Sequence, residues 1–140
     1  MPSEPLTVGS ICAGVGGLDI AMENLGFQVK WQIEIDEWRR GILERDWPNA
    51  KRHEDVTTVN YDELERVDCI TSGFPCQPWS YAGKQRGTED ERWIWDDIAR
   101  GIRTLQPSII FLENVPGLLR GGIEHVIRAL AENGYDAECD

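Results

Sequence analysis

Three short polar segments of this chain combine residue types that catalysis and ligand binding use. They are a glycine-rich run at 13–17 (AGVGG), a segment around Cys76 at 73–80 (GFPCQPWS) and an acidic one at 113–116 (ENVP). Each directly follows a short apolar run of the kind that forms a buried strand. We therefore expect all three to lie where a strand ends.

The glycine-rich run is suited to binding a ligand through its backbone. Glycines let the chain turn tightly and approach a ligand, and the helix that follows offers its N-terminus. Glu34 ends the second apolar run about twenty residues on, where an acidic residue can grip a ribose, and Asp55 follows a third run. A nicotinamide-type fingerprint has Gly or Ala at position 19, where this chain has Asp19. The pattern favours a nucleoside site, with a plain turn as the alternative.

Cys76 lies in surroundings that favour a thiolate. No acidic residue occurs from Cys69 through Thr88, and the only charges in that stretch are Lys84 and Arg86. A thiol among positive charges is more readily ionised, as a nucleophile requires. A lone cysteine is more often a small buried apolar residue, so that interpretation stays open.

Glu113 allows two interpretations. The commoner is that its carboxylate caps the turn after the strand. The other is that it lies in a cleft close to Cys76, because neighbouring parallel strands end at the same edge of a sheet. A nucleophile and an acid would then share one site.

The elements that would position these groups alternate between strand and helix. Apolar runs at 6–12, 29–35, 67–72 and 109–112, and a weaker one before Asp55, predict strands. Helical spacing predicts helices at 18–25, after Asp36 as far as Pro48, at 94–105 and at 123–130. Residues 73–87 are rich in Gly and Pro and predict a long loop. The order predicts a doubly wound, mostly parallel α/β sheet that binds ligands at the carboxyl ends of its strands.

Composition supports a folded domain. The 140 residues are 41% hydrophobic and 28% charged, which excludes a disordered acidic tail, a collagen-like chain and a coiled coil. The formal net charge is −11, which by itself argues against a polyanionic partner. No stretch predicts a membrane span or a secretory leader, so we expect a cytoplasmic protein.

The cysteines predict neither a metal site nor a disulfide framework. Cys12, Cys69, Cys76 and Cys139 form no CxxC pair and no cluster with histidine. We expect reduced thiols and no bound metal.

Taken in this order and at these distances, the three segments resemble the DNA (cytosine-5) methyltransferases. That family has a GxGG turn for S-adenosyl-L-methionine, a Pro-Cys catalytic loop and a Glu-Asn-Val segment. The resemblance runs from Val8 to about Tyr135, and phage and bacterial members are the most similar. Residues 83–87 (GKQRG) resemble the family's mobile active-site loop, and Asp55-Val56 the segment that contacts the adenine of the cofactor.

The resemblance implies a Rossmann-like sheet and assigns roles residue by residue. Cys76 would attack C6 of a cytosine flipped out of double-stranded DNA, and Glu113 would hydrogen-bond its N3 and amino group. The resemblance assigns the contacts with DNA and the active-site loop to Gln77, Ser80, Lys84 and Arg86. It assigns binding of the cofactor to Ala13, Gly14, Gly16, Gly17, Leu18, Glu34, Ile35, Asp55, Val56 and Pro75.

Some family features are replaced or absent. Cys12 stands where the family usually has Phe, and the segment at Trp93-Ile94-Trp95 is one residue shorter than the family pattern. The Gln-x-Arg-x-Arg segment and the target-recognition domain do not occur. We therefore expect residues 1–140 to form the N-terminal part of a catalytic domain, with a sheet incomplete at its C-terminal side. A C-terminal region or second subunit would complete it, in the cytoplasm of a bacterium or a phage-infected cell.

Other functions stay open. The chain could be a non-catalytic fragment that binds the cofactor or a partner chain, or it could act on tRNA, since one branch of the family shares its motifs. A Rossmann-type oxidoreductase is disfavoured by Asp19 and by the lack of a His or Tyr placed to donate a proton.

Overall fold

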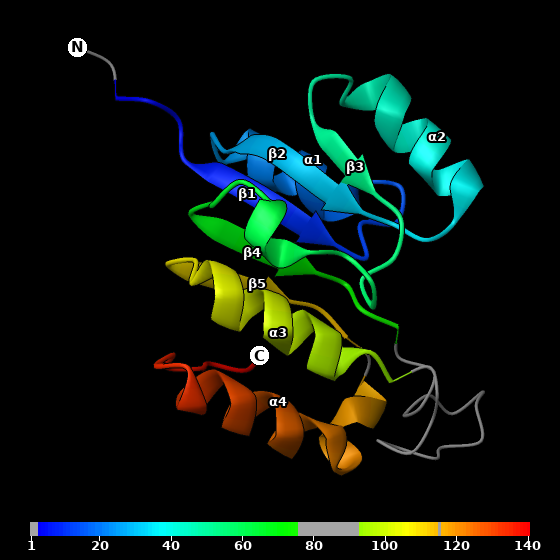
Figure 1. The fold of residues 1–140 in the computed structure, drawn as a ribbon. Coiled ribbons are helices and arrows are strands. Elements are labelled where there is room, and N and C mark those ends of the chain that lie inside the picture. Colours follow the sequence, from blue (N-terminus) through cyan, green and yellow to red (C-terminus); the bar gives the residue numbers. More distant parts are fainter. Residues whose placement is uncertain (1–2, 76–92, 115) are drawn as a thin grey trace.

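A single parallel sheet forms the centre of the molecule (Figure 1). The structure is a computed structural model that describes residues 3–75, 93–114 and 116–140. The sheet has five strands in the order β3-β2-β1-β4-β5, and every neighbouring pair is parallel. The strands are β1 (Thr7–Ile11), β2 (Gln28–Ile33), β3 (Lys51–His53), β4 (Cys69–Ser72) and β5 (Ile109–Leu112). The predicted α/β class, the parallel sheet and the weak third strand are confirmed.

The strand order reverses between β1 and β4. The chain runs outward from β1 to β2 and β3, then returns to the other side of β1 for β4 and β5. In open α/β sheets this switch point creates a crevice at the carboxyl ends of the strands, where ligands bind. Residues directly after β1 and β4 therefore form the expected binding edge.

Helices cover the sheet on both faces, and each face has its own apolar core. Met22 and Leu43 pack with Val8 on one face, whereas Ile98 and Ile102 pack with Ile70 on the other. The helices are α1 (Gly17–Asn24), α2 (Glu37–Asp46), α3 (Trp95–Leu105) and α4 (Gly122–Glu132). Within the described residues, the structure also has the short 3-10 turns η1 (Tyr61–Glu63) and η3 (Pro116–Arg120), which the sequence does not predict.

Helix α1 does not bury the apolar face that its spacing predicts. Leu25 is 74% exposed, whereas Asp19 is fully buried beside Met22. The side chains of Ser10 and Gln32 lie next to the Asp19 carboxyl and give it polar neighbours beneath the helix. These polar neighbours on the sheet therefore allow an acidic residue to lie on the buried face of α1.

Strand β5 is less buried than its apolar sequence predicts. Ile109 and Phe111 are 48% and 51% exposed, while the alternate residues Ile110 and Leu112 pack against the core that includes α3 and α4. Successive side chains of a strand point to opposite faces, and in the part of the chain that the structure describes β5 pairs only with β4. Among the described residues, one face of this edge strand has no helix over it, so the expectation of a fully buried strand is wrong.

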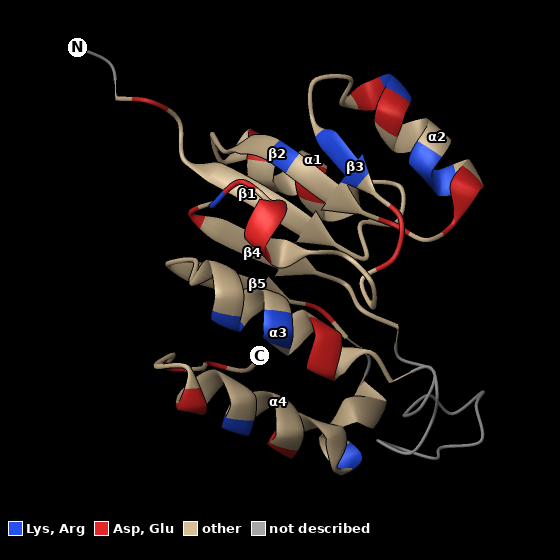
Figure 2. Ribbon diagram, in the orientation of Figure 1, with Lys and Arg blue, Asp and Glu red and all other residues tan. Residues whose placement is uncertain are grey.

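The charged residues of both signs are mixed over the helices and loops (Figure 2). Within the described part of the chain, no helix is long and apolar enough to cross a membrane.

Candidate functional site

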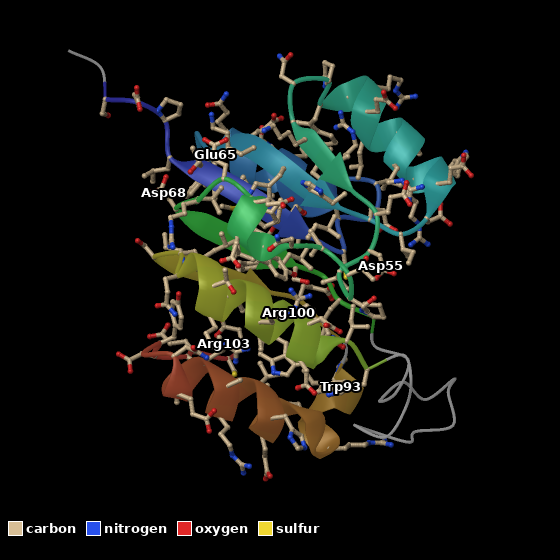
Figure 3. All side chains as sticks on the ribbon, viewed as in Figure 1. Asp55, Glu65, Asp68, Trp93, Arg100 and Arg103 are labelled. Atoms are coloured by element: carbon tan, nitrogen blue, oxygen red, sulfur yellow. The ribbon has the colours of Figure 1, made fainter. Side chains whose placement is uncertain are left out.

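A cavity of about 370 Å³ lies at the switch point of the sheet. Its walls come from residues 12 and 14 after β1, 33–35 and 39 at β2 and α2, 54–57 after β3, 73 and 75 after β4, and 94 before α3. Asp55 lies at this end of the sheet, and Asp68 and Glu65 lie at the opposite end (Figure 3). The cavity is thus at the carboxyl ends of the strands, as the fold predicts.

A second hollow of about 510 Å³ lies beside β3 and shares Glu54 and Asp55 with the first. Although it is larger, none of its lining residues follows β1, β4 or β5. We therefore place the candidate site in the smaller cavity, because its lining includes residues from two of the predicted segments, Gly14 from one and Gly73 and Pro75 from the other.

The glycine turn is built around two left-handed positions. Gly14 has a φ of 63° and Gly16 a φ of 94°, which side-chain-bearing residues rarely adopt. A Cβ on Gly16 would also overlap the ring of Trp47. Gly16 is the N-cap of α1, so the turn leads directly into the first backbone N–H groups of the helix.

Glu34 fastens this turn to the end of β2. Its carboxylate is buried, and it accepts hydrogen bonds from the backbone N–H of Gly14 at 2.8 Å and of Asp36 at 2.9 Å, one on each oxygen. Each carboxylate oxygen still has a lone pair. Glu34 can therefore accept hydrogen bonds from the hydroxyls of a ribose while it holds the turn.

Asp55 and Val56 form the wall beyond β3. The Asp55 carboxylate accepts from the N–H and hydroxyl of Thr57 at 2.9 and 2.7 Å, and these bonds lower the pKa of Asp55. Val56 is buried and lines the cavity together with the exposed Ile35. An ionised acceptor next to apolar side chains suits a heterocyclic base with an amino group.

Glu113 lies against the segment that follows β4. The register pairs Ser72 with Leu112, so Gly73 and Glu113 come next on adjacent strands. A Cβ built on Gly73 would lie 3.3 Å from Oε2 of Glu113, and Glu113 donates its N–H to the Ser72 carbonyl at 2.9 Å. Asn114 adds a bond from its side-chain amide to the Phe74 carbonyl at 3.2 Å. The Glu-Asn pair thus holds residues 73–74, directly before Pro75 and Cys76.

The structure describes only some of the residues proposed for catalysis. The Glu113 carboxylate lies close to Gly73, which lines the cavity, and its catalytic role stays a prediction. The roles of Cys76, Gln77, Ser80, Lys84 and Arg86 also stay predictions, and these residues lie outside the described ones.

Two other thiols are poor nucleophiles. Burial, and secondarily the charge of Glu34, raises the pKa of Cys12 to about 12. Burial, and secondarily Asp68, raises the pKa of Cys69 to about 11. Both therefore stay protonated at neutral pH, and neither has the electropositive environment that activates a cysteine.

Six of the proposed cofactor residues line the cavity: Gly14, Glu34, Ile35, Asp55, Val56 and Pro75. Four others, Ala13, Gly16, Gly17 and Leu18, belong to the adjoining turn and the start of α1 but not to the lining. Seven lining residues were not among those proposed for the cofactor: Cys12, Ile33, Arg39, Glu54, Thr57, Gly73 and Ile94. Most of them lie within a few residues of a strand end, which is the one sequence signal that would have found them.

Comparison with known proteins gives concordant matches. Residues 6–140 match the family model of C-5 cytosine-specific DNA methylases. The Type II methyltransferase M.PspPI of Psychrobacter sp. (strain TA137) is 38% identical over 96% of this chain and 34% of its own length. M.HhaI of Haemophilus parahaemolyticus is 38% identical over 74% of this chain and 32% of its own length. The chain thus spans about a third of the length of these relatives.

Solved structures agree on the fold. A prophage-encoded candidate DNA modification methyltransferase from E. coli superposes with a TM-score of 0.74 and 27% identity, over 91% of this chain and 38% of that one. The Dnmt2 methyltransferase of S. pombe superposes with a TM-score of 0.73 at 20% identity, over 94% of this chain and 43% of that one, which shows the shared fold alone.

Proposed function

We propose a function from the premise that the chain belongs to the C-5 cytosine-specific DNA methylase family, whose model matches residues 6–140. The chain supplies the cofactor-binding and nucleophile-bearing part of an enzyme that transfers a methyl group from S-adenosyl-L-methionine to C5 of cytosine in DNA. The observation that carries this proposal is that the Glu113 carboxylate lies close to Gly73, a cavity-lining residue in the segment that leads to Cys76. Because the chain spans about a third of its relatives, the complete activity needs a complementing region or subunit.

The cavity fits S-adenosyl-L-methionine in size and charge. A volume of about 370 Å³ lies in the range of small-molecule sites. Its lining has three carboxylates, Glu34, Glu54 and Asp55, against one guanidinium, Arg39. An excess of negative charge suits a ligand with a net positive charge, and Glu34 and Asp55 offer acceptors for ribose hydroxyls and an adenine amino group. When bound there, the cofactor supplies a methyl group activated by its positively charged sulfur.

The residues of the chain prepare the base to accept that methyl group. The Cys76 thiolate forms a bond to C6 of a flipped cytosine, and the electron pair displaced from the C5–C6 double bond makes C5 nucleophilic. The protonated carboxyl of Glu113 donates a hydrogen bond to N3 and accepts one from the amino group, so its proton offsets the negative charge that spreads over the ring. After C5 is methylated, its proton is lost to a base, and the electron pair restores the double bond and expels Cys76.

DNA binding by this chain alone should be weak. Phosphate binding needs positive charge, and the formal net charge is −11. We expect almost no retention of duplex DNA in a filter-binding assay at physiological salt. Tight binding by the isolated chain would contradict the need for a complementing part.

The nucleophile is tested with duplex DNA that carries 5-fluorocytosine in the recognition sequence of the Psychrobacter relative. The chain is mixed with the C-terminal two thirds of that relative and with S-adenosyl-L-methionine. We expect a covalent protein–DNA adduct on a denaturing gel, since fluorine cannot leave C5 as a proton would. Cys76→Ser should abolish the adduct, whereas Cys69→Ser, a matched change of a fully buried thiol outside the cavity lining, should retain it.

Several results would overturn the proposal. An adduct with the Cys76→Ser chain would show that the nucleophile is another group. Cofactor binding without an adduct in any mixture would favour the non-catalytic fragment. Methyl transfer to tRNA in place of duplex DNA would change the substrate.

A further inference from the structure

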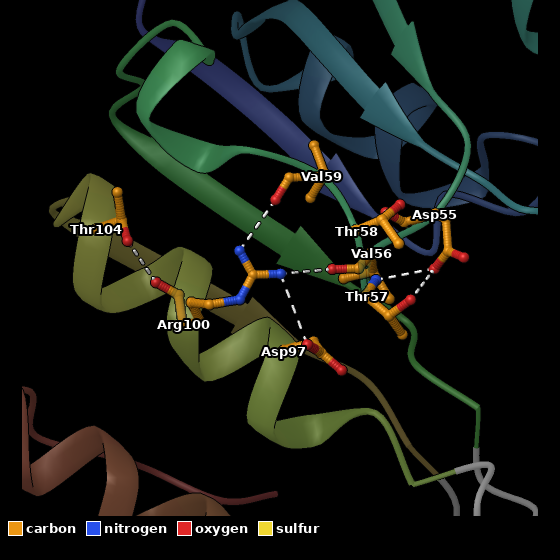
Figure 4. A network of polar contacts seen from close by, with 8 residues as sticks. All are labelled: Asp55, Val56, Thr57, Thr58, Val59, Asp97, Arg100 and Thr104. Carbon is orange, nitrogen blue, oxygen red and sulfur yellow. Dashed lines mark hydrogen bonds and ion pairs between the residues drawn. The ribbon is translucent and has the colours of Figure 1, made fainter.

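The segment at 55–59, which forms one wall of the cavity, is a single tight turn. The Asp55 carbonyl accepts hydrogen bonds from the N–H of Thr58 at 3.2 Å and of Val59 at 3.0 Å, and the Asp55 side chain caps the turn through Thr57. As in a helix, the carbonyls at the far end of such a turn find no donor partners within it. Those of Val56 and Val59 face helix α3 (Figure 4).

Arg100, from the middle of α3, binds both carbonyls with one guanidinium. Its Nη2 donates to Val56 at 2.9 Å and its Nη1 to Val59 at 3.0 Å. The group is itself held by Asp97, at 3.6 Å from Nη2, and by the ring of Tyr61, whose centroid lies 4.8 Å from Cζ. The rigid planar fork of arginine can serve two acceptors at once, which a lysine ammonium on a flexible stem does poorly.

These contacts connect two walls of the cofactor cavity. Val56 lines the cavity directly, and Ile94, the N-cap of α3, lines it from the other side. Arg100 therefore fixes the distance between the turn and the helix. Its bonds go to backbone carbonyls, so its effect does not depend on which side chains occupy the turn.

We propose that Arg100 is a positioning residue for the cofactor: it holds the turn at 55–59 in the arrangement that binds the adenosyl part of S-adenosyl-L-methionine. This inference rests on the proposed function. Without Arg100, only a fraction of molecules would have the turn in place, and the dissociation constant rises as the inverse of that fraction. If that fraction is about one tenth, the constant rises about tenfold.

Electrostatics alone would have the opposite effect. Arg100 adds a positive charge near a cavity whose lining is mainly acidic. Its removal should therefore strengthen the binding of a positively charged ligand if charge were its only contribution. The sign of the change in affinity thus separates positioning from a general charge effect.

The test measures the dissociation constant of radiolabelled S-adenosyl-L-methionine by equilibrium dialysis, on the 140-residue chain alone and on the complemented mixture. Arg100→Gln should weaken binding about tenfold, and Arg100→Lys, which retains the charge and the stem, should fall between Arg100→Gln and the parent. Arg66→Gln is the matched control, since Arg66 also donates to a carbonyl of α3, that of Leu105 at 3.0 Å, away from the cavity lining. It should leave the constant within about twofold.

Hydrogen exchange supplies the second measurement. The amides of Thr58 and Val59 should exchange faster in Arg100→Gln than in the parent, but not in Arg66→Gln, after correction for global stability. If Arg100→Gln does not fold, Arg100→Lys carries both measurements.

The outcomes separate this inference from the function on which it rests. Equal affinity of the parent and the Arg100 variants, or equal loss in Arg66→Gln, would overturn the positioning role alone. Tighter binding by Arg100→Gln would assign Arg100 an electrostatic effect instead. No binding by the parent chain, alone or complemented, would overturn the proposed function and this inference with it.

Discussion

Asp19→Asn should stabilise the protein progressively as the pH rises. Asp19 is fully buried beneath α1, where the side chains of Ser10 and Gln32 lie beside its carboxyl. Burial raises the pKa of Asp19 from 3.8 to about 6, although the side chains of Ser10 and Gln32 beside it favour the charged form. The folded protein therefore holds a proton that the unfolded chain releases more easily.

The direction of the effect follows from this difference in proton affinity. The contribution of Asp19 to stability is complete below its unfolded pKa of 3.8 and is lost as the pH rises through the folded pKa of about 6. A shift of about two units corresponds to a loss of about 3 kcal/mol at neutral pH. The amide that replaces the carboxyl in Asp19→Asn does not titrate, so the variant should not suffer this loss. About half of the loss, roughly 1.5 kcal/mol, falls between about pH 5 and pH 8.

The assay is urea unfolding of the parent and of Asp19→Asn at several pH values from about 5 to 8. The range begins near pH 5 because an acidic chain loses solubility as its carboxylates are protonated. The free-energy difference between variant and parent should grow by roughly 1.5 kcal/mol across the range. The free-energy difference at the acidic end also includes the packing of the new amide. The test therefore uses only the change of this difference with pH.

Asp55→Asn is the control for the slope. Hydrogen bonds from Thr57 lower the pKa of Asp55, so this carboxyl is ionised in both folded and unfolded chains throughout the range of about pH 5–8. Its variant should differ from the parent by a constant amount. If the Asp19→Asn difference is equally constant, within about 0.3 kcal/mol, the carboxyl is not held protonated by burial and the reasoning is wrong.

Three other changes test the turn, the cofactor wall and the edge of the sheet. Gly16→Ala should lower the free energy of unfolding in urea by at least about 2 kcal/mol, because the φ there is 94° and a methyl group would overlap Trp47. Gly17→Ala is the control: its new carbon has open space around it, so it should not destabilise the protein. Glu34→Gln should weaken S-adenosyl-L-methionine binding about tenfold in equilibrium dialysis. Both oxygens of the Glu34 carboxylate accept backbone N–H groups, whereas an amide can accept on its oxygen only. An unchanged dissociation constant would contradict this. Phe111→Ser should reduce self-association of the chain in sedimentation velocity, because the Phe111 ring is 51% exposed on an edge strand. Identical sedimentation of parent and variant would exclude this strand as a surface for self-association.

The sequence predicted the order of the elements better than their orientation. Short apolar runs fix where strands form, and the alternation with helices leaves parallel crossovers as the natural arrangement. Periodicity could not show that Asp19, rather than Leu25, faces the sheet, because that depends on Ser10 and Gln32 from two other strands. Likewise, the apolar sequence of β5 does not reveal that one face is uncovered.

The site shows the same division. Glu34 and Asp55 were predictable because each follows a strand end, and the fold brings strand ends together. Arg100 was not, because its partners are the backbone carbonyls of Val56 and Val59, which every residue type has. A residue that acts on the backbone of a distant loop leaves no pattern of side-chain types in the sequence.

Gly73 shows how the topology joins the two halves of the proposed reaction. It follows β4, which lies between β1 and β5, so it has the cofactor cavity on one side and Glu113 on the other. It lines the cavity, and a Cβ there would be 3.3 Å from the Glu113 carboxylate. Gly73 therefore lies between the wall of the proposed cofactor cavity and the acid proposed to hold the base. A side chain at this position would require the Glu113 carboxylate to shift by a few tenths of an ångström, so glycine allows its present close approach.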